Sequence, residues 1–130
     1  MRLDKSISHL VKLFNRIYKV FPASSCGGHK NPRGSQCELG YFWIILNIKN
    51  EEFLNQLTSI VDVSNESSGY DMFELEQHLI YGTWCLIGET SNMHIIQDFV
   101  EKYISIKSNL KQESDWNKFY SYLSSTPTIL

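Results

Sequence analysis

Two cysteines and a histidine in one segment are the residues best suited to chemistry. They occur as Cys26-Gly-Gly-His29 followed by Cys37. Thiolates and imidazole nitrogens are ligands that Zn²⁺ prefers, and short spacings let one loop provide several of them. A fourth ligand is missing, and Cys85 or His78 would complete the shell only if the fold brought one of them to the loop. We expect no cofactor, and zinc held by Cys26, His29 and Cys37 stays an open alternative.

The same residues have the types that nucleophilic catalysis uses. The amides of Gly27 and Gly28 could bind an anion beside Cys26, and His29 is near in sequence. An active thiol needs a base within hydrogen-bonding distance and a third group that orients this base, which the spacing does not guarantee. Residues 24–30 also lack the glycine-lysine-serine/threonine pattern of a phosphate-binding loop. We therefore do not expect an enzyme, although a small enzyme centred on this loop stays open.

Acidic and aromatic residues concentrate between positions 66 and 81. Carboxylates that orient a cation and aromatic rings that anchor it are typical of protein interfaces. Paired carboxylates can also hydrolyse glycosides, but a chain of 130 residues shows no second domain that would build the cleft. A solvated strand face without a function is the other alternative. The candidate partner-binding residues are Glu66, Tyr70, Asp71, Glu74, Glu76 and Tyr81.

The formal net charge of −2 conceals an uneven distribution of charge along the chain. Residues 1–34 carry seven Lys and Arg against one Asp, a net charge of +6. Residues 35–101 carry one Lys against eleven acidic residues, a net charge of −10, and residues 102–130 have a net charge of +2. The first interpretation is that the basic segment lies on the acidic middle and neutralises it. The second is that the acidic surface faces a basic partner, because such fields steer association.

The composition is that of an ordinary globular protein, with 42% hydrophobic and 20% charged residues. It disfavours disordered and fibrous proteins, and 130 residues suit a single domain over 1–130. The longest apolar run, Tyr41 to Leu46, is far shorter than the roughly 18 residues of a membrane span. Three cysteines and no apolar leader predict reduced thiols and a cytoplasmic location, although a Cys26–Cys37 disulfide stays open.

Hydrophobic periodicity predicts seven elements in the order α-β-α-β-β-α-α. The expected helices are 3–21, with a basic face, 50–60, 91–106 and 113–124, and the expected strands are 41–49, 70–76 and 79–87. A long Gly-, Pro- and Cys-containing loop at 22–40 and a polar turn at 64–69 connect them, and the tail 126–130 is expected to fray. Strand 41–49 is apolar on both faces, which predicts a central strand with cover on both sides.

The expected fold class is α+β, with a small, mainly antiparallel sheet of about three strands packed by four helices. A ferredoxin-like core that lacks one strand would fit this order. The expected function is that of a non-catalytic cytosolic binding protein, a small inhibitor of the immunity-protein or antitoxin type. Its acidic, aromatic-rich surface would mask a basic protein partner such as a nuclease toxin. A nucleic-acid-binding module that uses the basic helix is a further alternative, disfavoured because the acidic middle repels phosphate.

Overall fold

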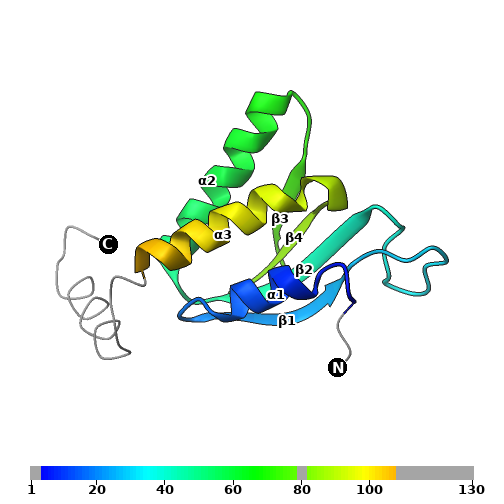
Figure 1. The fold of residues 1–130 in the computed structure, drawn as a ribbon, viewed down its shortest axis with the longest axis horizontal. Coiled ribbons are helices and arrows are strands. Elements are labelled where there is room, and N and C mark those ends of the chain that lie inside the picture. Colours follow the sequence, from blue (N-terminus) through cyan, green and yellow to red (C-terminus); the bar gives the residue numbers. More distant parts are fainter. Residues whose placement is uncertain (1–3, 79–81, 108–130) are drawn as a thin grey trace.

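The computed structural model describes residues 4–78 and 82–107 of the chain (Figure 1). The helices are α1 (Ser8–Asn15), α2 (Glu51–Ser68) and α3 (Met93–Lys107), the last preceded by the short 3₁₀ helix η1 (Thr90–Asn92). The strands are β1 (Val20–Cys26), β2 (Tyr41–Ile48), β3 (Phe73–Gln77) and β4 (Thr83–Glu89). The expected α+β class is therefore confirmed.

The four strands form one sheet in the order β1-β2-β4-β3, and each neighbouring pair is antiparallel. Strand β2 is central, as expected, because it pairs with β1 on one side and with β4 on the other. Strands β2 and β3 are parallel to each other, with β4 between them and α2 as their connection. Among the described strands, β1 and β3 form the two opposite edges of the sheet.

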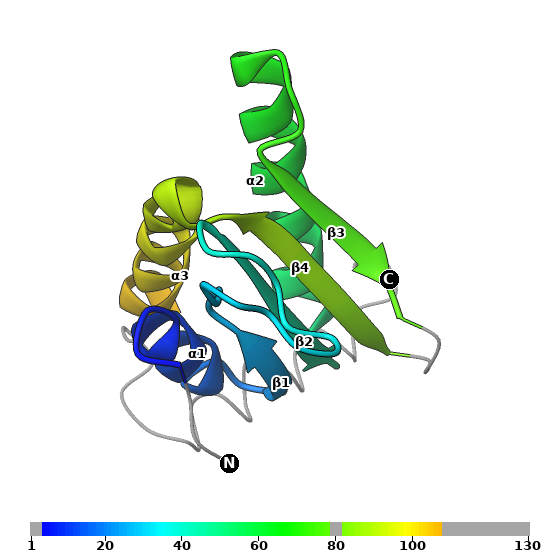
Figure 2. The ribbon, with the colours of Figure 1, turned by 90° about the vertical axis from the view of Figure 1, so that its right-hand side faces the viewer.

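The three helices lie on one face of the sheet (Figures 1 and 2). Phe42, Ile44 and Leu46 alternate along β2 and are fully buried beneath these helices. Phe14 from α1 and Phe53 from α2 belong to the same hydrophobic cluster. The alternation of β2 therefore builds one core between the sheet and the helix layer.

The second face of the sheet carries no helix of residues 4–78 and 82–107, so these residues show cover of strand 41–49 on one side. Trp43 and Ile45 on this face are half-buried. Their partners across the ladder to β4, Ile87 and Cys85, are half-buried as well. Apolar atoms contribute much of any folded surface, so an apolar second face does not require a second layer. We call this side the open face.

The N-terminal segment differs most from the prediction. The expected helix 3–21 is an α-helix only over α1, and β1 takes up both its end and the start of the expected loop 22–40. Lys19 has a φ of 60°, a left-handed conformation, at the turn of the chain into the strand. The sheet therefore has four strands rather than about three, and the loop shrinks to 27–40.

Strand β1 forms although Pro22 cannot donate a ladder hydrogen bond. Proline is tolerated in an edge strand, and β1 pairs with β2 alone among the described strands. A register shift between Pro22 and Ser24 marks a bulge in this ladder. Cys26, at the end of the strand, pairs with Trp43 of β2. Strand pairing has thus overridden the helical spacing of the apolar residues in this segment.

Helix α2 extends well beyond the expected end at Ile60. Asn50 caps its first turn as expected, because its side-chain oxygen accepts a hydrogen bond from the Phe53 N–H at 3.1 Å. Gly69, with a φ of 77°, ends the helix in the left-handed conformation. The polar run 64–69, expected to be a turn, supplies the end of the helix, where few apolar residues reveal a helical period.

The hairpin of β3 and β4 and the helix α3 are confirmed with shifted boundaries. The start of the expected strand 79–87 includes residues 79–81, which lie outside the described residues. The expected helix 113–124 and the tail 126–130 also lie outside them, so the described α-helices number three rather than four. In the described part of the chain, no helix has both the length and the apolar character needed to cross a membrane.

Candidate functional site

A groove of about 430 Å³ lies between α2 and β3, at one edge of the sheet. Its lining contains no Lys, Arg or His among the described residues, but four carboxylates, from Asp62, Asp71, Glu74 and Glu76. Its other lining residues are Thr58, Val61, Asn65, Phe73, Leu75 and Trp84. None of the four carboxylates forms an ion pair within residues 4–78 and 82–107. Within the described part of the chain, this acidic groove is therefore a negative surface that no ion pair neutralises, with an indole ring in its wall.

The outer edge of β3 leaves backbone groups available beside the acidic groove. In an antiparallel ladder, every second residue directs its N–H and C=O away from the neighbouring strand. The Asn65 side chain binds both outward groups of Phe73: its Nδ2 donates to the oxygen at 2.9 Å, and its Oδ1 accepts from the N–H at 3.1 Å. Leu75 and Gln77 share the orientation of Phe73, and no described strand pairs with them on that side. The available edge therefore begins at Leu75, beyond the Asn65 contact.

The structure brings together half of the predicted partner-binding residues. Those that line the acidic groove are Asp71, Glu74 and Glu76. Glu66 and Tyr70 are exposed but do not line it. The Tyr70 hydroxyl instead accepts a hydrogen bond from Asn92 Nδ2 at 3.2 Å. Tyr81 lies outside the described residues.

Sequence reasoning missed the contribution of α2 to the acidic groove. Thr58, Val61, Asp62 and Asn65 all line it. Their spacing of three, four and seven residues from the first is that of one helix face. The pattern was present in the sequence, but the expected helix ends at Ile60 and therefore excludes three of these four residues, Val61, Asp62 and Asn65.

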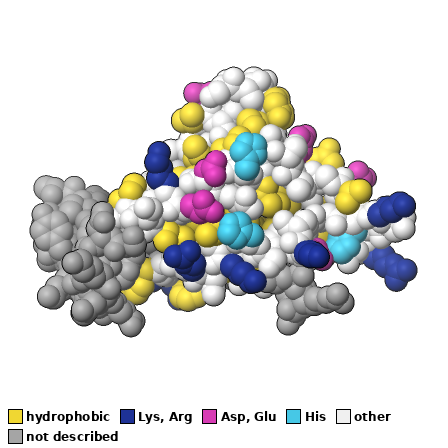
Figure 3. Space-filling model, in the orientation of Figure 1, with side chains coloured by type: hydrophobic (Ala, Val, Ile, Leu, Met, Phe, Trp, Pro, Cys, Tyr) yellow, Lys and Arg dark blue, Asp and Glu magenta, His cyan; other side chains and the backbone are white. Residues whose placement is uncertain are grey.

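The basic N-terminal segment does not cover the acidic groove. Helix α1 packs against β1 and α3, whereas the groove lies at β3, the opposite edge of the sheet. On the helix-covered side, Lys and Arg side chains gather along α1 and at the tip of the loop (Figure 3). His9 Nε2 of α1 lies 3.3 Å from Glu101 Oε1, which belongs to α3. The first interpretation of the charge layout, internal neutralisation, therefore does not hold for the groove.

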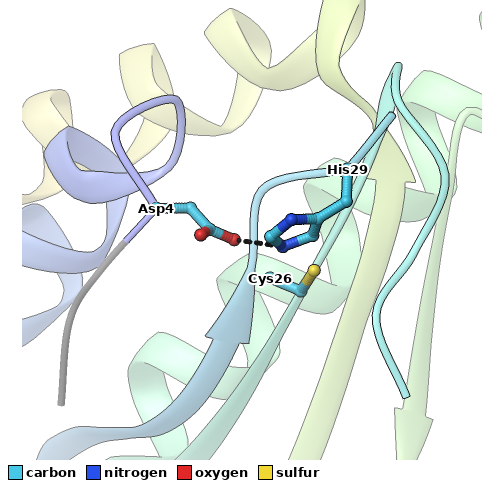
Figure 4. A group of neighbouring side chains, drawn as sticks. All are labelled: Asp4, Cys26 and His29. Atoms are coloured by element: carbon cyan, nitrogen blue, oxygen red, sulfur yellow. Dashed lines mark hydrogen bonds and ion pairs between the residues drawn. The ribbon is translucent and has the colours of Figure 1, made fainter. Parts of the chain in front are cut away.

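Asp4, Cys26 and His29 form a second candidate site, where the N-terminal segment meets β1 and the loop (Figure 4). One ligand atom of each residue lies within 4.8 Å of those of the other two. His29 Nε2 donates to Asp4 Oδ2 at 3.1 Å, since a carboxylate only accepts, and the Gly27 N–H donates to the same oxygen at 2.8 Å. The Gly27 hydrogen bond is the main cause that holds the pKa of Asp4 below its usual value, and His29 contributes as well.

The two glycines of this loop make the close approach possible. A Cβ atom on Gly27 would lie 2.2 Å from the Ser6 hydroxyl oxygen and 3.1 Å from Asp4 Cβ, so a larger residue would force these side chains to shift. Gly28 has a φ of 98°, and a Cβ atom there would lie 2.8 Å from the Tyr41 carbonyl oxygen. The Gly-Gly pair therefore lets the chain turn so that His29 reaches the N-terminal segment.

Cys37 lies beside this cluster but is not part of it. Its backbone N–H donates to Cys26 Sγ at 3.4 Å, whereas its thiol donates to the Tyr41 carbonyl oxygen at 3.4 Å. Burial raises the pKa of Cys37 to about 11, and the neighbouring Cys26 adds to the shift. All three cysteines of the chain are free thiols. The group of possible ligands that the structure brings together therefore contains Asp4 beside Cys26 and His29, whereas the alternative from the sequence had Cys37.

Burial within the cluster disfavours nucleophilic catalysis. Cys26 is only 3% exposed, whereas the side chains of Asp4 and His29 are each 30% exposed. A nucleophilic sulfur has to reach its substrate, so the alternative of a cysteine enzyme gains no support from this geometry. Neither Cys85 nor His78 completes the cluster as a ligand.

Replacing Asp4 by Ala is expected to lower the free energy of unfolding of the metal-free protein by about 1–2 kcal/mol at pH 7. The reason is that the Gly27 N–H and His29 lose their acceptor. The folded-state pKa of Asp4 is depressed, so its contribution is present above the unfolded pKa of about 3.9 and is lost as the pH falls through the folded value. Urea denaturation in the presence of a chelator, at pH 7 and at about pH 3, measures both effects.

The matched control is Asp98→Ala, which removes an exposed carboxylate from α3. It should change the free energy of unfolding by less than about 0.5 kcal/mol. The role assigned to Asp4 would be contradicted if the variant and the wild type had the same free energy of unfolding at pH 7. It would also be contradicted if their difference in this free energy grew toward pH 3.

Comparisons of the chain with protein-family models, with curated proteins and with solved structures found no match.

Proposed function

We propose that the protein is a non-catalytic, cytosolic binding protein of the inhibitor or immunity type, whose acidic groove takes a basic segment of a protein partner such as a nuclease toxin. The observation that carries this proposal is a groove with four carboxylates and no neutralising cation among the described residues. Carboxylates held close together repel one another, and a cationic partner converts that repulsion into attraction. Nucleic acid is disfavoured as the occupant, because its phosphates would face the same carboxylates.

The backbone of β3 supports a specific way to hold such a segment. Leu75 and Gln77 direct their N–H and C=O groups away from β4, so an extended segment can add to β3 as a further strand. Its alternate side chains would then lie on the two faces of the sheet. One set would lie beside Glu74 and Glu76 on the open face, and the other beside Leu75 on the helix-covered face. The segment that fits best alternates Lys or Arg with apolar residues.

We also propose that the core is a ferredoxin-like arrangement whose outer strand comes from the N-terminal side. Strands β2 and β3 are parallel, β4 lies between them, and α2 connects them, which supports a split βαβ unit. In this interpretation, β1 takes the edge position beside β2 that the expected core lacked.

A calorimetric titration of the full chain with a short peptide that alternates Lys and Val tests the proposed function. We expect this peptide to bind, with an affinity that falls at least about tenfold between roughly 10 mM and 150 mM salt, because exposed charges are screened. A peptide of the same length that alternates Glu and Val is the matched control and should not bind. Equal affinities for the two peptides, or an affinity for the Lys peptide that is independent of salt, would contradict the proposal.

A further inference from the structure

We infer that Asp4, Cys26 and His29 form a binding site for a single Zn²⁺ ion that joins the N-terminal segment to the start of the loop. The site is independent of the proposed partner-binding function. It lies at the end of β1, whereas the acidic groove lies at β3, the opposite edge of the sheet.

The ligand atoms of the three residues are already arranged around a common point. In a tetrahedral zinc shell with bond lengths of roughly 2.0–2.3 Å, neighbouring ligand atoms lie about 3.3–3.6 Å apart. Asp4 Oδ2 and His29 Nε2 are 3.1 Å apart, and all three ligand atoms lie within 4.8 Å of one another. Side-chain movements of roughly 1 Å would therefore complete three of the four zinc bonds.

The hydrogen bonds of the metal-free cluster occupy the places of the metal bonds. His29 donates its Nε2 proton to Asp4, and Cys26 is a free thiol. On binding, the proton of the neutral imidazole moves from Nε2 to Nδ1. The lone pair that this leaves on Nε2 then bonds to Zn²⁺. The thiol proton of Cys26 is released to solvent, and the thiolate and the carboxylate bond to the ion. One proton per zinc ion is thus released, and the site's net charge rises from −1 to 0.

The donor set favours zinc over the hard cations. Ca²⁺ and Mg²⁺ prefer shells of oxygen atoms, whereas one thiolate, one imidazole and one carboxylate suit Zn²⁺. The 30% exposure of Asp4 and His29 gives solvent and metal a path to the cluster, while Cys26 forms its buried side. The Cys37 N–H donates to Cys26 Sγ at 3.4 Å, a contact that would stabilise the bound thiolate from outside the shell. Water would supply the fourth ligand.

Binding of Zn²⁺ and of Co²⁺ to the full chain, purified in chelator and then freed of it, tests this inference. Elemental analysis should show one zinc ion per chain, and zinc should raise the Tm. Cobalt should give the sulfur-to-metal absorption of a bound thiolate. Cys26→Ser should abolish that absorption, and His29→Gln should weaken zinc binding by at least about tenfold. The matched control, Cys85→Ser, removes a thiol from β4 and should leave both readouts unchanged.

Folded wild-type protein that takes up no stoichiometric zinc overturns the inference. Zinc affinity that is unchanged in His29→Gln, or cobalt absorption that is lost in Cys85→Ser and kept in Cys26→Ser, overturns it as well. Circular dichroism checks that each variant is folded. Should Cys26→Ser fail to fold, the wild-type stoichiometry and His29→Gln decide the question.

Discussion

Replacing both Glu74 and Glu76 by Lys is expected to weaken the binding of the alternating Lys and Val peptide by at least about a hundredfold. Both side chains are exposed on the open face of β3. The change converts two attractive contacts into two repulsive ones, and a loss of about 1.4 kcal/mol at each position gives this factor. The free energy of unfolding should change by less than about 1 kcal/mol, because exposed side chains contribute little to it. Calorimetric titration at about 150 mM salt, where the Debye length is only about 8 Å, measures the affinity.

The matched control replaces Glu38 and Glu66 by Lys. Both are exposed, neither lines the acidic groove, and the double change alters the net charge by the same amount. We expect this variant to bind the peptide within about threefold of the wild type, because exposed charges beyond a Debye length are largely screened. An equal loss of affinity in the two variants would show that binding follows the net charge of the protein, and the proposed site would be wrong.

Replacing Phe53 by Ala is expected to lower the free energy of unfolding by about 3–5 kcal/mol. The Phe53 side chain is fully buried, and its ring contacts one ring of α1 and two of α3. The ring centroids lie 6.0 Å from Phe14, 5.6 Å from Phe99 and 5.0 Å from Tyr103. Since Phe53 belongs to α2, it joins all three helices at one point. The total free energy of unfolding of a domain is only about 5–15 kcal/mol, so this loss is a large fraction of it.

Urea denaturation of Phe53→Ala and of Phe21→Ala checks this expectation. Phe21 is the same residue type on β1, but its side chain is 52% exposed. Its removal should cost less than about 1 kcal/mol. A loss below about 1.5 kcal/mol for Phe53→Ala would contradict the view that this ring holds the helix layer together.

The fold could be predicted where one element buries a regular stripe of apolar residues. The stripe of strand 41–49 and the cap at Asn50 were both recognised correctly. Strand β1 could not be recognised, because its residues alternate poorly and include Pro22. It is a strand because β2 provides a pairing edge, and that edge exists only in the folded sheet. The polar end of α2 was missed for a related reason, since it buries few side chains.

In the candidate sites too, residues that are close in sequence could be predicted, whereas residues brought together only by folding could not. Asp71, Glu74 and Glu76 are close in sequence, so their shared surface could be predicted. Asp62 joins them from α2 because α2 packs against β3, and the local sequence does not show which helix packs against which strand.

The Cys-Gly-Gly-His spacing likewise indicated that the loop supplies possible metal ligands. Asp4 was not anticipated, because no spacing rule connects the N-terminal segment with a loop that it meets only when α1 packs on β1.

Backbone hydrogen exchange of the full chain, with and without a saturating amount of the alternating Lys and Val peptide, tests the central claim most directly. We predict that the Leu75 and Gln77 amides exchange rapidly in the free protein and slowly in the complex, because the added strand accepts their hydrogen bonds. The Phe73 amide should change little, because Asn65 already accepts its hydrogen bond. A bound peptide that leaves the exchange of Leu75 and Gln77 unchanged would contradict the account.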